Sequence, residues 1–184
     1  DGLSASESFF SEAVYASRHF PCHFIGGSAG GKFDFKDTYL YDGQKVVQGH
    51  AVIAFMKINP AYRYAIFTSH NFEKQNVSFL ITEASQEQRW VKSVLTDDHH
   101  VVSFIDALKK HFRVSSNQDL EHQLEDYSFA IEIEGQLFIR SIAGFDFEKD
   151  RVSFFCDLSM GEQLYLVKRQ DLVQCTDKDF RDFM

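Results

Sequence analysis

Most of the chain alternates between hydrophobic and polar residues with the two-residue period of a β-strand. Such alternation places one face of a strand in a core and the other in solvent. Asp42-Gly43 between two alternating runs is a strong hairpin signal, and Ala51–Phe55 is apolar on both faces, as in a covered central strand. We predict strands over the ranges 22–25, 38–41, 45–47, 48–58, 62–68, 77–84, 89–95, 129–133, 137–142, 152–158 and 164–167.

The period changes to that of a helix in four places. Ser4 and Glu7 have the spacing of a capping box, in which each side chain satisfies a free backbone donor of the first turn. Asp97-Asp98 stands just before the second amphipathic segment, and we assign these residues to helix capping rather than to acid–base chemistry. The predicted helices cover the ranges 4–18, 101–112, 117–125 and 171–184.

The last predicted helix carries two large apolar residues near its end, Phe180 and Phe183. Leaving both in solvent is costly. Two alternatives stay open: these rings pack back on the domain, or they form the self-association surface of a homodimer.

Long runs of strands with helices on either side predict an α+β fold with mixed, largely antiparallel β-sheets and flanking helices. The change from strand to helix period falls near Leu95 to Asp98. We therefore expect two lobes, residues 1–95 and residues 96–184.

Charge and composition exclude several classes of function. The formal net charge of −8 argues against a nucleic-acid partner, because phosphate binding needs a basic face. No apolar run approaches the roughly 20 residues of a membrane-spanning helix, so no membrane insertion is expected. Three cysteines without paired spacing predict a reducing, cytoplasmic location. The 20 phenylalanines indicate a large packed core or an aromatic-lined ligand cavity.

A glycine-rich segment, Gly26-Gly27-Ser28-Ala29-Gly30-Gly31, invites three chemical interpretations. The spacing around Ser28 matches the nucleophile elbow of a serine hydrolase, and the run into Lys32 approaches a P-loop. Both motifs need a helix directly after the loop, whereas the next residues alternate or turn. We therefore expect no enzyme. A loop whose backbone donors approach a small anionic ligand, and a tight structural turn, remain as alternatives.

Histidines could hold a metal or haem only where they converge. His99 and His100 would diverge on a helix, and no metal-ligand spacing occurs, so no metal site is predicted. His23, His50 and His70 lie within or beside apolar strands, and they are the candidate axial ligands if a haem is bound. A structural role for each is the alternative, and no cofactor is expected otherwise.

Arg140 interrupts an otherwise apolar strand, Leu137–Ile142. Its charge either reaches solvent or a salt bridge, or it anchors a ligand carboxylate, which a guanidinium binds through two parallel hydrogen bonds. Both alternatives stay open.

Several segments, in order along nearly the whole chain, resemble the FIST sensory domain, an input module of bacterial signalling proteins. Asp1-Gly2-Leu3-Ser4 is similar to the D-G-L-S stretch of that family. Phe24–Gly30 resembles its G-G-x-A-G loop, and Thr38–Gly43 the strand and turn that follow. The other similar segments are Phe79–Ala84, with its strand ending in Thr-x-Ala, and Phe138–Ile142, Ser159–Leu164 and Asp171–Val173, which resemble the C-terminal half.

The resemblance implies the C-terminal part of a FIST N region over 1–95 and a FIST C region over 96–184. It implies a sensory domain that binds a small molecule such as an amino acid. The signal would pass to a methyl-accepting chemotaxis module, a histidine kinase or a cyclic-dinucleotide enzyme. A haem-binding nitric oxide sensor is the alternative, and a serine hydrolase using Ser28 is the third hypothesis. The candidate ligand-binding residues are Gly26, Gly27, Ser28, Gly30, Thr38 and Arg140.

Overall fold

Residues 6–20, 22–31, 37–96 and 98–184 are described by this computed structural model. The chain divides into two compact units, Asp1–Tyr64 and Ala65–Met184. This division differs in place from the lobe boundary expected at residue 95, because strands before that residue share a sheet with strands after it. The assignment of two FIST regions that meet at residue 95 stays a prediction.

The first unit contains one helix and one hairpin. Helix α1 (Ser6–Ser17) confirms the predicted first helix, while its expected cap residue Ser4 lies outside the described residues. Strands β1 (Leu40–Tyr41) and β2 (Val46–Val47) pair antiparallel. The Asp42 carboxylate accepts hydrogen bonds from two backbone N–H groups of the turn, at 2.9 and 2.8 Å. The predicted Asp42-Gly43 hairpin is confirmed, since Gly43 also has the positive φ of +97° that this turn requires.

The expected central strand at 48–58 is wrong in this structure. These residues are irregular, and Phe55 and Met56 are 70% and 79% exposed. The ranges 22–25 and 62–68 are likewise irregular. A strand needs a neighbour for its backbone hydrogen bonds, and none of the described segments pairs with these three ranges. Apolar side chains favour a strand, but they do not supply its partner.

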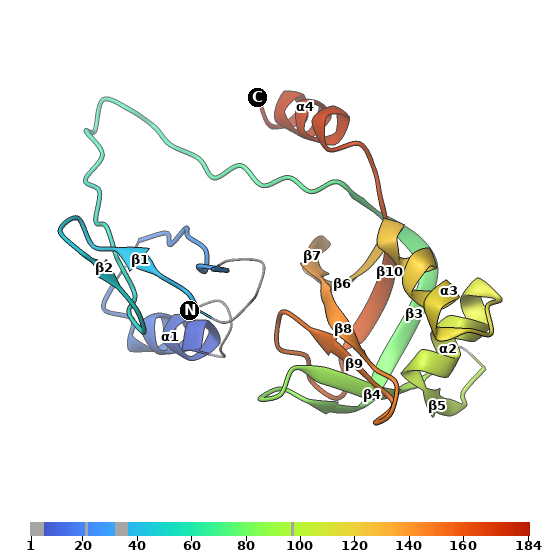
Figure 1. The fold of residues 1–184 in the computed structure, drawn as a ribbon. Helices are drawn as coiled ribbons and strands as arrows, with labels where there is room; N and C mark the ends of the chain where they lie inside the picture. Colours follow the sequence, from blue (N-terminus) through green and yellow to red (C-terminus); the bar gives the residue numbers. More distant parts are fainter. Residues whose placement is uncertain (1–5, 21, 32–36, 97) are drawn as a thin grey trace. The chain divides into compact units, whose positions relative to one another are not determined.

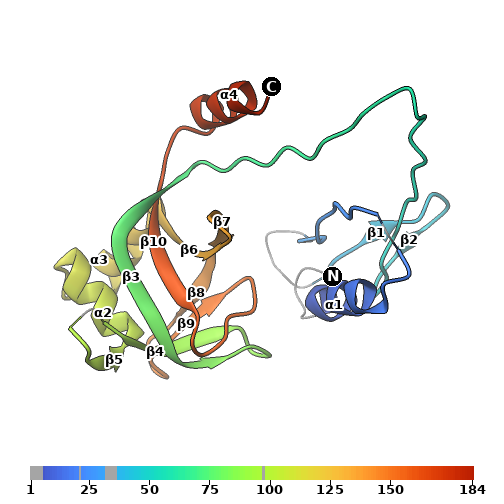
Figure 2. The same cartoon turned by 180° about the vertical axis from the view of Figure 1, so that it is seen from behind.

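The second unit is built on one antiparallel sheet of eight strands (Figures 1 and 2). Neighbouring strands follow the order β7-β6-β10-β3-β4-β9-β8, and β5 pairs with β4. This sheet with its helices confirms the predicted α+β class. The strands are β3 (Phe72–Ser85), β4 (Trp90–Leu95), β5 (Val101–Ser103), β6 (Tyr127–Ile133), β7 (Gln136–Arg140), β8 (Ile142–Asp146), β9 (Arg151–Phe154) and β10 (Gln163–Arg169).

The two ends of the sheet come together. Strands β7 and β8 stand at opposite ends of the order, yet only Ser141 separates them in the chain. The sheet must therefore curve strongly, as Figure 2 shows from behind. Phe155 donates its backbone N–H to the carbonyl oxygen of Ser141 at 3.1 Å. We call this junction, formed by Arg140, Ser141 and Phe155, the seam.

The concave face of the sheet holds a core of phenylalanines. The ring of Phe104 lies 5.3 Å from the rings of both Phe79 and Phe129, and Phe154 stacks on the same ring at 6.5 Å. All four side chains are at most 3% exposed. Aromatic pairs at such separations add to the stability that burial provides. The phenylalanine excess therefore contributes to a packed core.

Helix α2 (Phe104–Phe112) begins three residues later than predicted, because Val101–Ser103 pairs with β4 as β5. The cap is Ser103, whose hydroxyl accepts from the backbone N–H of Asp106 at 3.3 Å. The expected capping by Asp97-Asp98 is wrong for Asp98, which instead bonds the Thr96 hydroxyl. Asp97 lies outside the described residues. A shorter helix, α3 (Asn117–Gln123), follows as predicted.

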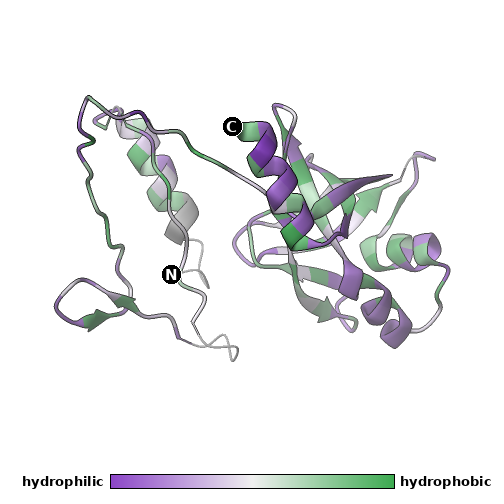
Figure 3. Ribbon diagram, turned by 90° about the horizontal axis from the view of Figure 1, so that it is seen from above, coloured by the Kyte–Doolittle hydropathy of each residue, from purple (hydrophilic) through white to green (hydrophobic). Residues whose placement is uncertain are grey.

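Helix α4 (Leu172–Phe183) confirms the last predicted helix. Its cap is Asp171, which accepts from the backbone N–H of Gln174 at 2.8 Å. Figure 3 shows hydrophobic and hydrophilic residues on this helix, which ends near the label C. Phe67 packs against Phe180 and Phe183 at ring distances of 5.5 and 5.4 Å. These contacts favour packing within the unit over self-association, and the homodimer stays a prediction.

Candidate functional site

The glycine segment is exposed and irregular. A Cβ atom built at Gly26, Gly27 or Gly30 would meet nothing within 4 Å. The same atom at Gly31 would lie 2.1 Å from the carbonyl oxygen of Asp37, and Gly31 has a φ of +70°. Only glycine fits that position without strain. The chain thus approaches itself closely at the end of the segment and leaves open space at its start.

Ser28 does not stand in the setting that a nucleophile elbow needs. Residues 29–31 directly after it are irregular, and 32–36 lie outside the described residues. The hydrolase motif requires a helix at that point to support the strained serine. The absence of helix in 29–31 gives the hydrolase interpretation no support.

Thr38 differs from the glycines because it is buried, with 8% of its surface exposed. Its methyl group would lie 3.6 Å from a Cβ built at Gly31. The structure therefore brings the end of the glycine segment and the start of the hairpin together. The four other candidate positions of this segment, Gly26, Gly27, Ser28 and Gly30, are all exposed.

Each of the three candidate haem ligands has a contact within its own unit. His23 packs edge-to-face on Tyr64 with ring centroids 6.1 Å apart, and His50 Nδ1 contacts the carbonyl oxygen of Gln48; both belong to the first unit. His70 belongs to the second unit, where its Nδ1 accepts from the backbone N–H of Phe72 at 3.3 Å. Each has the local structural contact that the alternative interpretation expects. Within the described ranges no three His, Cys, Asp or Glu side chains are grouped to hold a metal ion.

Arg140 is the candidate whose surroundings are most unusual. It stands opposite Phe129 in the register of β6 and β7, so its side chain leaves the sheet on the core-bearing face. Its Nη1 donates to the neighbouring carbonyl oxygen of Ile139 at 3.3 Å. Its Nε is buried, and no hydrogen-bond partner for it occurs in the described part of the chain. A buried donor left unpaired costs about 1–3 kcal/mol.

Charged groups surround a half-buried thiol close to the seam. Burial raises the pKa of Cys156 above its ordinary value; the charges of Arg140 and Arg89 act against this, while Asp157 and Glu162 add to it. Arg89 Nε donates to an Asp157 carboxylate oxygen at 2.9 Å. For Arg140, by contrast, the described residues provide no carboxylate partner. In this region the Arg89 guanidinium therefore has a carboxylate partner, and the Arg140 guanidinium has none among the described residues.

Sequence reasoning missed Arg89, Asp157 and Glu162 in this cluster. Arg89 follows a polar turn, and Asp157 follows a strand 68 residues later, so no local pattern joins them. Only the pairing of β4 with β9 brings the two segments together. The available signal was a charged residue at or next to a terminal position of a predicted strand, as for Arg89 in 89–95 and Asp157 in 152–158, and charged residues are common there.

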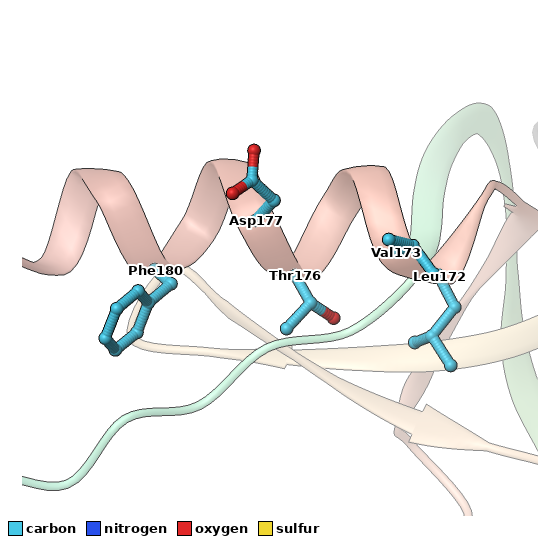
Figure 4. Close-up of a pocket in the computed structure, with 5 residues that line it drawn as sticks. All are labelled: Leu172, Val173, Thr176, Asp177 and Phe180. Carbon is cyan, nitrogen blue, oxygen red and sulfur yellow. The ribbon is translucent and has the colours of Figure 1, made fainter.

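Two surface hollows lie elsewhere in the second unit. The larger, about 410 Å³, runs along helix α4 and is mainly apolar (Figure 4); its lining residues are Leu172, Val173, Thr176, Asp177 and Phe180. The smaller, about 330 Å³, is lined by Leu124, Ile142 and Phe145 together with Glu121 and Glu125. Neither hollow is lined by a candidate ligand-binding residue from the sequence analysis, although Phe180 of the candidate self-association surface lines the larger one.

Each helix in the described ranges falls short of the length and apolar content that a bilayer-spanning helix needs.

Comparison with curated proteins found no match, and comparison with solved structures found none either. A family model described as the FIST N domain matches residues 1–95 of the 184-residue chain. The matched stretch contains the glycine segment, Thr38 and the hairpin, on which part of the resemblance depends. The chain therefore belongs to the FIST N domain family.

Proposed function

We propose that this chain is a non-enzymatic sensory module that binds a small polar molecule, such as an amino acid, and signals to an output partner. The observation that carries the proposal is the FIST N domain match over 1–95, because FIST domains are small-molecule sensory domains. A chemotaxis-type module, a histidine kinase and a cyclic-dinucleotide enzyme are the output classes that the family resemblance implies.

The glycine segment supports ligand binding in the first unit. Gly26, Gly27 and Gly30 present backbone groups without side chains in the way, and open space lies around each of them. Backbone N–H groups in such loops bind anions without bringing a charged side chain. The close approach of Gly31 to Thr38 fixes the end of the segment. Fewer loop conformations then compete with the one that binds the ligand.

A thermal-shift screen of the 20 free amino acids tests the proposal. A ligand at 100 times its Kd stabilises the folded state by about 2.7 kcal/mol, which raises the Tm of a chain of this size by roughly 5–10 °C. We expect a saturable rise with a subset of amino acids, confirmed by calorimetric titration. The matching amino-acid amides, which lack the carboxylate, are the control. A flat response to all 20 compounds would contradict the proposed ligand class.

The non-enzymatic part of the proposal needs its own test. Ser28 is exposed and is followed by irregular chain. We expect no hydrolysis of a generic aryl ester above the buffer rate, and Ser28→Ala should leave that rate unchanged. Hydrolysis by the unaltered chain that disappears in Ser28→Ala would establish the hydrolase alternative.

A further inference from the structure

The guanidinium of Arg140 has one hydrogen-bonded edge and one edge whose Nε has no partner among the described residues. Nη1 donates to the Ile139 carbonyl oxygen. The opposite edge consists of Nε–H and Nη2–H, and Nε is the buried donor that lacks a partner among the described residues. This is the edge that binds the two oxygens of a carboxylate in parallel.

The location restricts what can reach that edge. Arg140 ends β7 at the seam, where the closing of the sheet brings Ser141 and Phe155 into contact. The Arg140 side chain as a whole is partly exposed, while its Nε is shielded from bulk water. The backbone at Arg140 is held by the Ser128 hydroxyl, which donates to its carbonyl oxygen at 3.3 Å. The Ser128 bond constrains the backbone at Arg140, and the bond from Nη1 to the Ile139 carbonyl oxygen constrains its side chain.

The neighbouring charges favour a monoanion over a dianion. Arg89 is the second guanidinium of the cluster, but Asp157 already neutralises it. Glu162 adds a further carboxylate around the same thiol, and its oxygen accepts from the backbone N–H of Ser159 at 2.7 Å. Of the two guanidinium groups that act on the Cys156 thiol, only that of Arg140 has no carboxylate partner among the described residues. A single carboxylate matches the one unpaired charge.

We propose that Arg140 anchors a carboxylate-bearing small molecule at the seam, through two parallel hydrogen bonds from Nε–H and Nη2–H. This inference deepens the proposed sensory function, on which it rests for the presence of a ligand. It assigns to the second unit a binding contribution of its own. The carboxylate supplies the acceptor that the buried Nε lacks.

The direct test observes the arginine Nε–H signals of the whole chain by nuclear magnetic resonance during titration with sodium acetate. We expect a saturable downfield shift of the Arg140 signal, no such shift with chloride at matched ionic strength, and weaker binding of phosphate. Arg151 is the matched control: its Nε is also buried without a partner, but its guanidinium stacks on Trp90 at 4.1 Å. The Arg151 signal should not move.

Arg140→Lys keeps the charge and removes the two-donor edge, and it should weaken acetate binding roughly 10- to 100-fold. Arg151→Lys should leave binding unchanged. The wild-type titration decides the question by itself if Arg140→Lys does not fold. An Arg140 signal that ignores acetate, an equal response of Arg151, or tighter binding of phosphate than of acetate would each overturn the inference.

The failure of this inference is distinguishable from failure of the proposed function. Amino acids that stabilise the wild type and Arg140→Lys equally would leave the sensory proposal standing and overturn the role of Arg140. Acetate that binds at Arg140, in a chain that no amino acid stabilises, would support the anchor and remove support from the proposed ligand.

Discussion

Arg89 and Asp157 form an ion pair of 2.9 Å across 68 residues of sequence, and their side chains are only 14% and 23% exposed. The pair joins the start of β4 to the segment after β9. Phe154 strengthens the same junction by donating its backbone N–H to the Arg89 carbonyl oxygen at 2.8 Å. Arg89 itself has a φ of +54°, so its backbone is held in a conformation that non-glycine residues rarely adopt. The turn before β4 is thus stabilised by contacts from the end of β9 and the segment that follows it.

Asp157→Asn should destabilise the chain by about 1–3 kcal/mol, because it removes the charge of the carboxylate that accepts a hydrogen bond from the half-buried Arg89 guanidinium. Urea denaturation measures the change. The control is Lys110→Gln at the exposed Lys110–Asp98 pair, whose side chains are 77% and 53% exposed. That substitution should cost no more than about 0.5 kcal/mol. Equal effects of both substitutions would contradict a structural role for the buried pair.

Gly31→Ala should disrupt the first unit. Its φ is +70°, and the added methyl group would lie 2.1 Å from the Asp37 carbonyl oxygen, so the backbone must move at a cost of about 1–3 kcal/mol. Gly30→Ala is the matched control, because nothing lies within 4 Å of a Cβ there. Limited proteolysis at residues 22–31 reports the change, and we expect faster cleavage in Gly31→Ala alone. The same cleavage rate in both variants would contradict the close approach.

Replacing Phe180 and Phe183 together with Ser should lower stability without a change in molecular mass. Both rings pack on Phe67, and each is 46% exposed, so the loss of partial burial should cost about 1–2 kcal/mol per ring. Val173→Ser, at a position 76% exposed on the same helix, is the control. Denaturation and light scattering are measured side by side. A dimer that becomes a monomer would instead establish the self-association surface.

The carboxyl group of Asp42 should titrate below the ordinary aspartate pKa of about 3.9. Backbone hydrogen bonds from Lys45 and Gln44 stabilise its charged form and lower its pKa. Because the Asp42 pKa is lower in the folded state, the ionised carboxyl group stabilises the hairpin at pH values above the unfolded-state pKa of about 3.9. This contribution is lost as the pH falls through the folded-state pKa. Nuclear magnetic resonance titration of the carboxyl carbon measures the midpoint, and a value at or above 3.9 would contradict the turn geometry.

The hairpin and the helices were predictable because their causes are local. Asp42-Gly43 supplies both the acceptor and the positive φ of its turn, within four residues. The apolar spacing of α2 predicted the helix itself but not its first residue. Val101–Ser103 pairs with β4 instead of joining the helix, and a backbone partner outside the segment decided that boundary.

The α+β class, the hairpin, most strands of the second unit and the family were predictable without the structure, because side-chain period, turn chemistry and short motifs are properties of neighbouring residues. Three features required the tertiary structure. Residues 48–58 are irregular, and β7 and β8 meet at the seam. Arg140 lies at this seam, and its buried Nε has no hydrogen-bond partner among the described residues. Each of these depends on which distant segment supplies or withholds a hydrogen-bond partner. The pattern of hydrophobic and polar side chains indicates which residues tend to be buried. It does not indicate which distant segment will pair with their backbone groups.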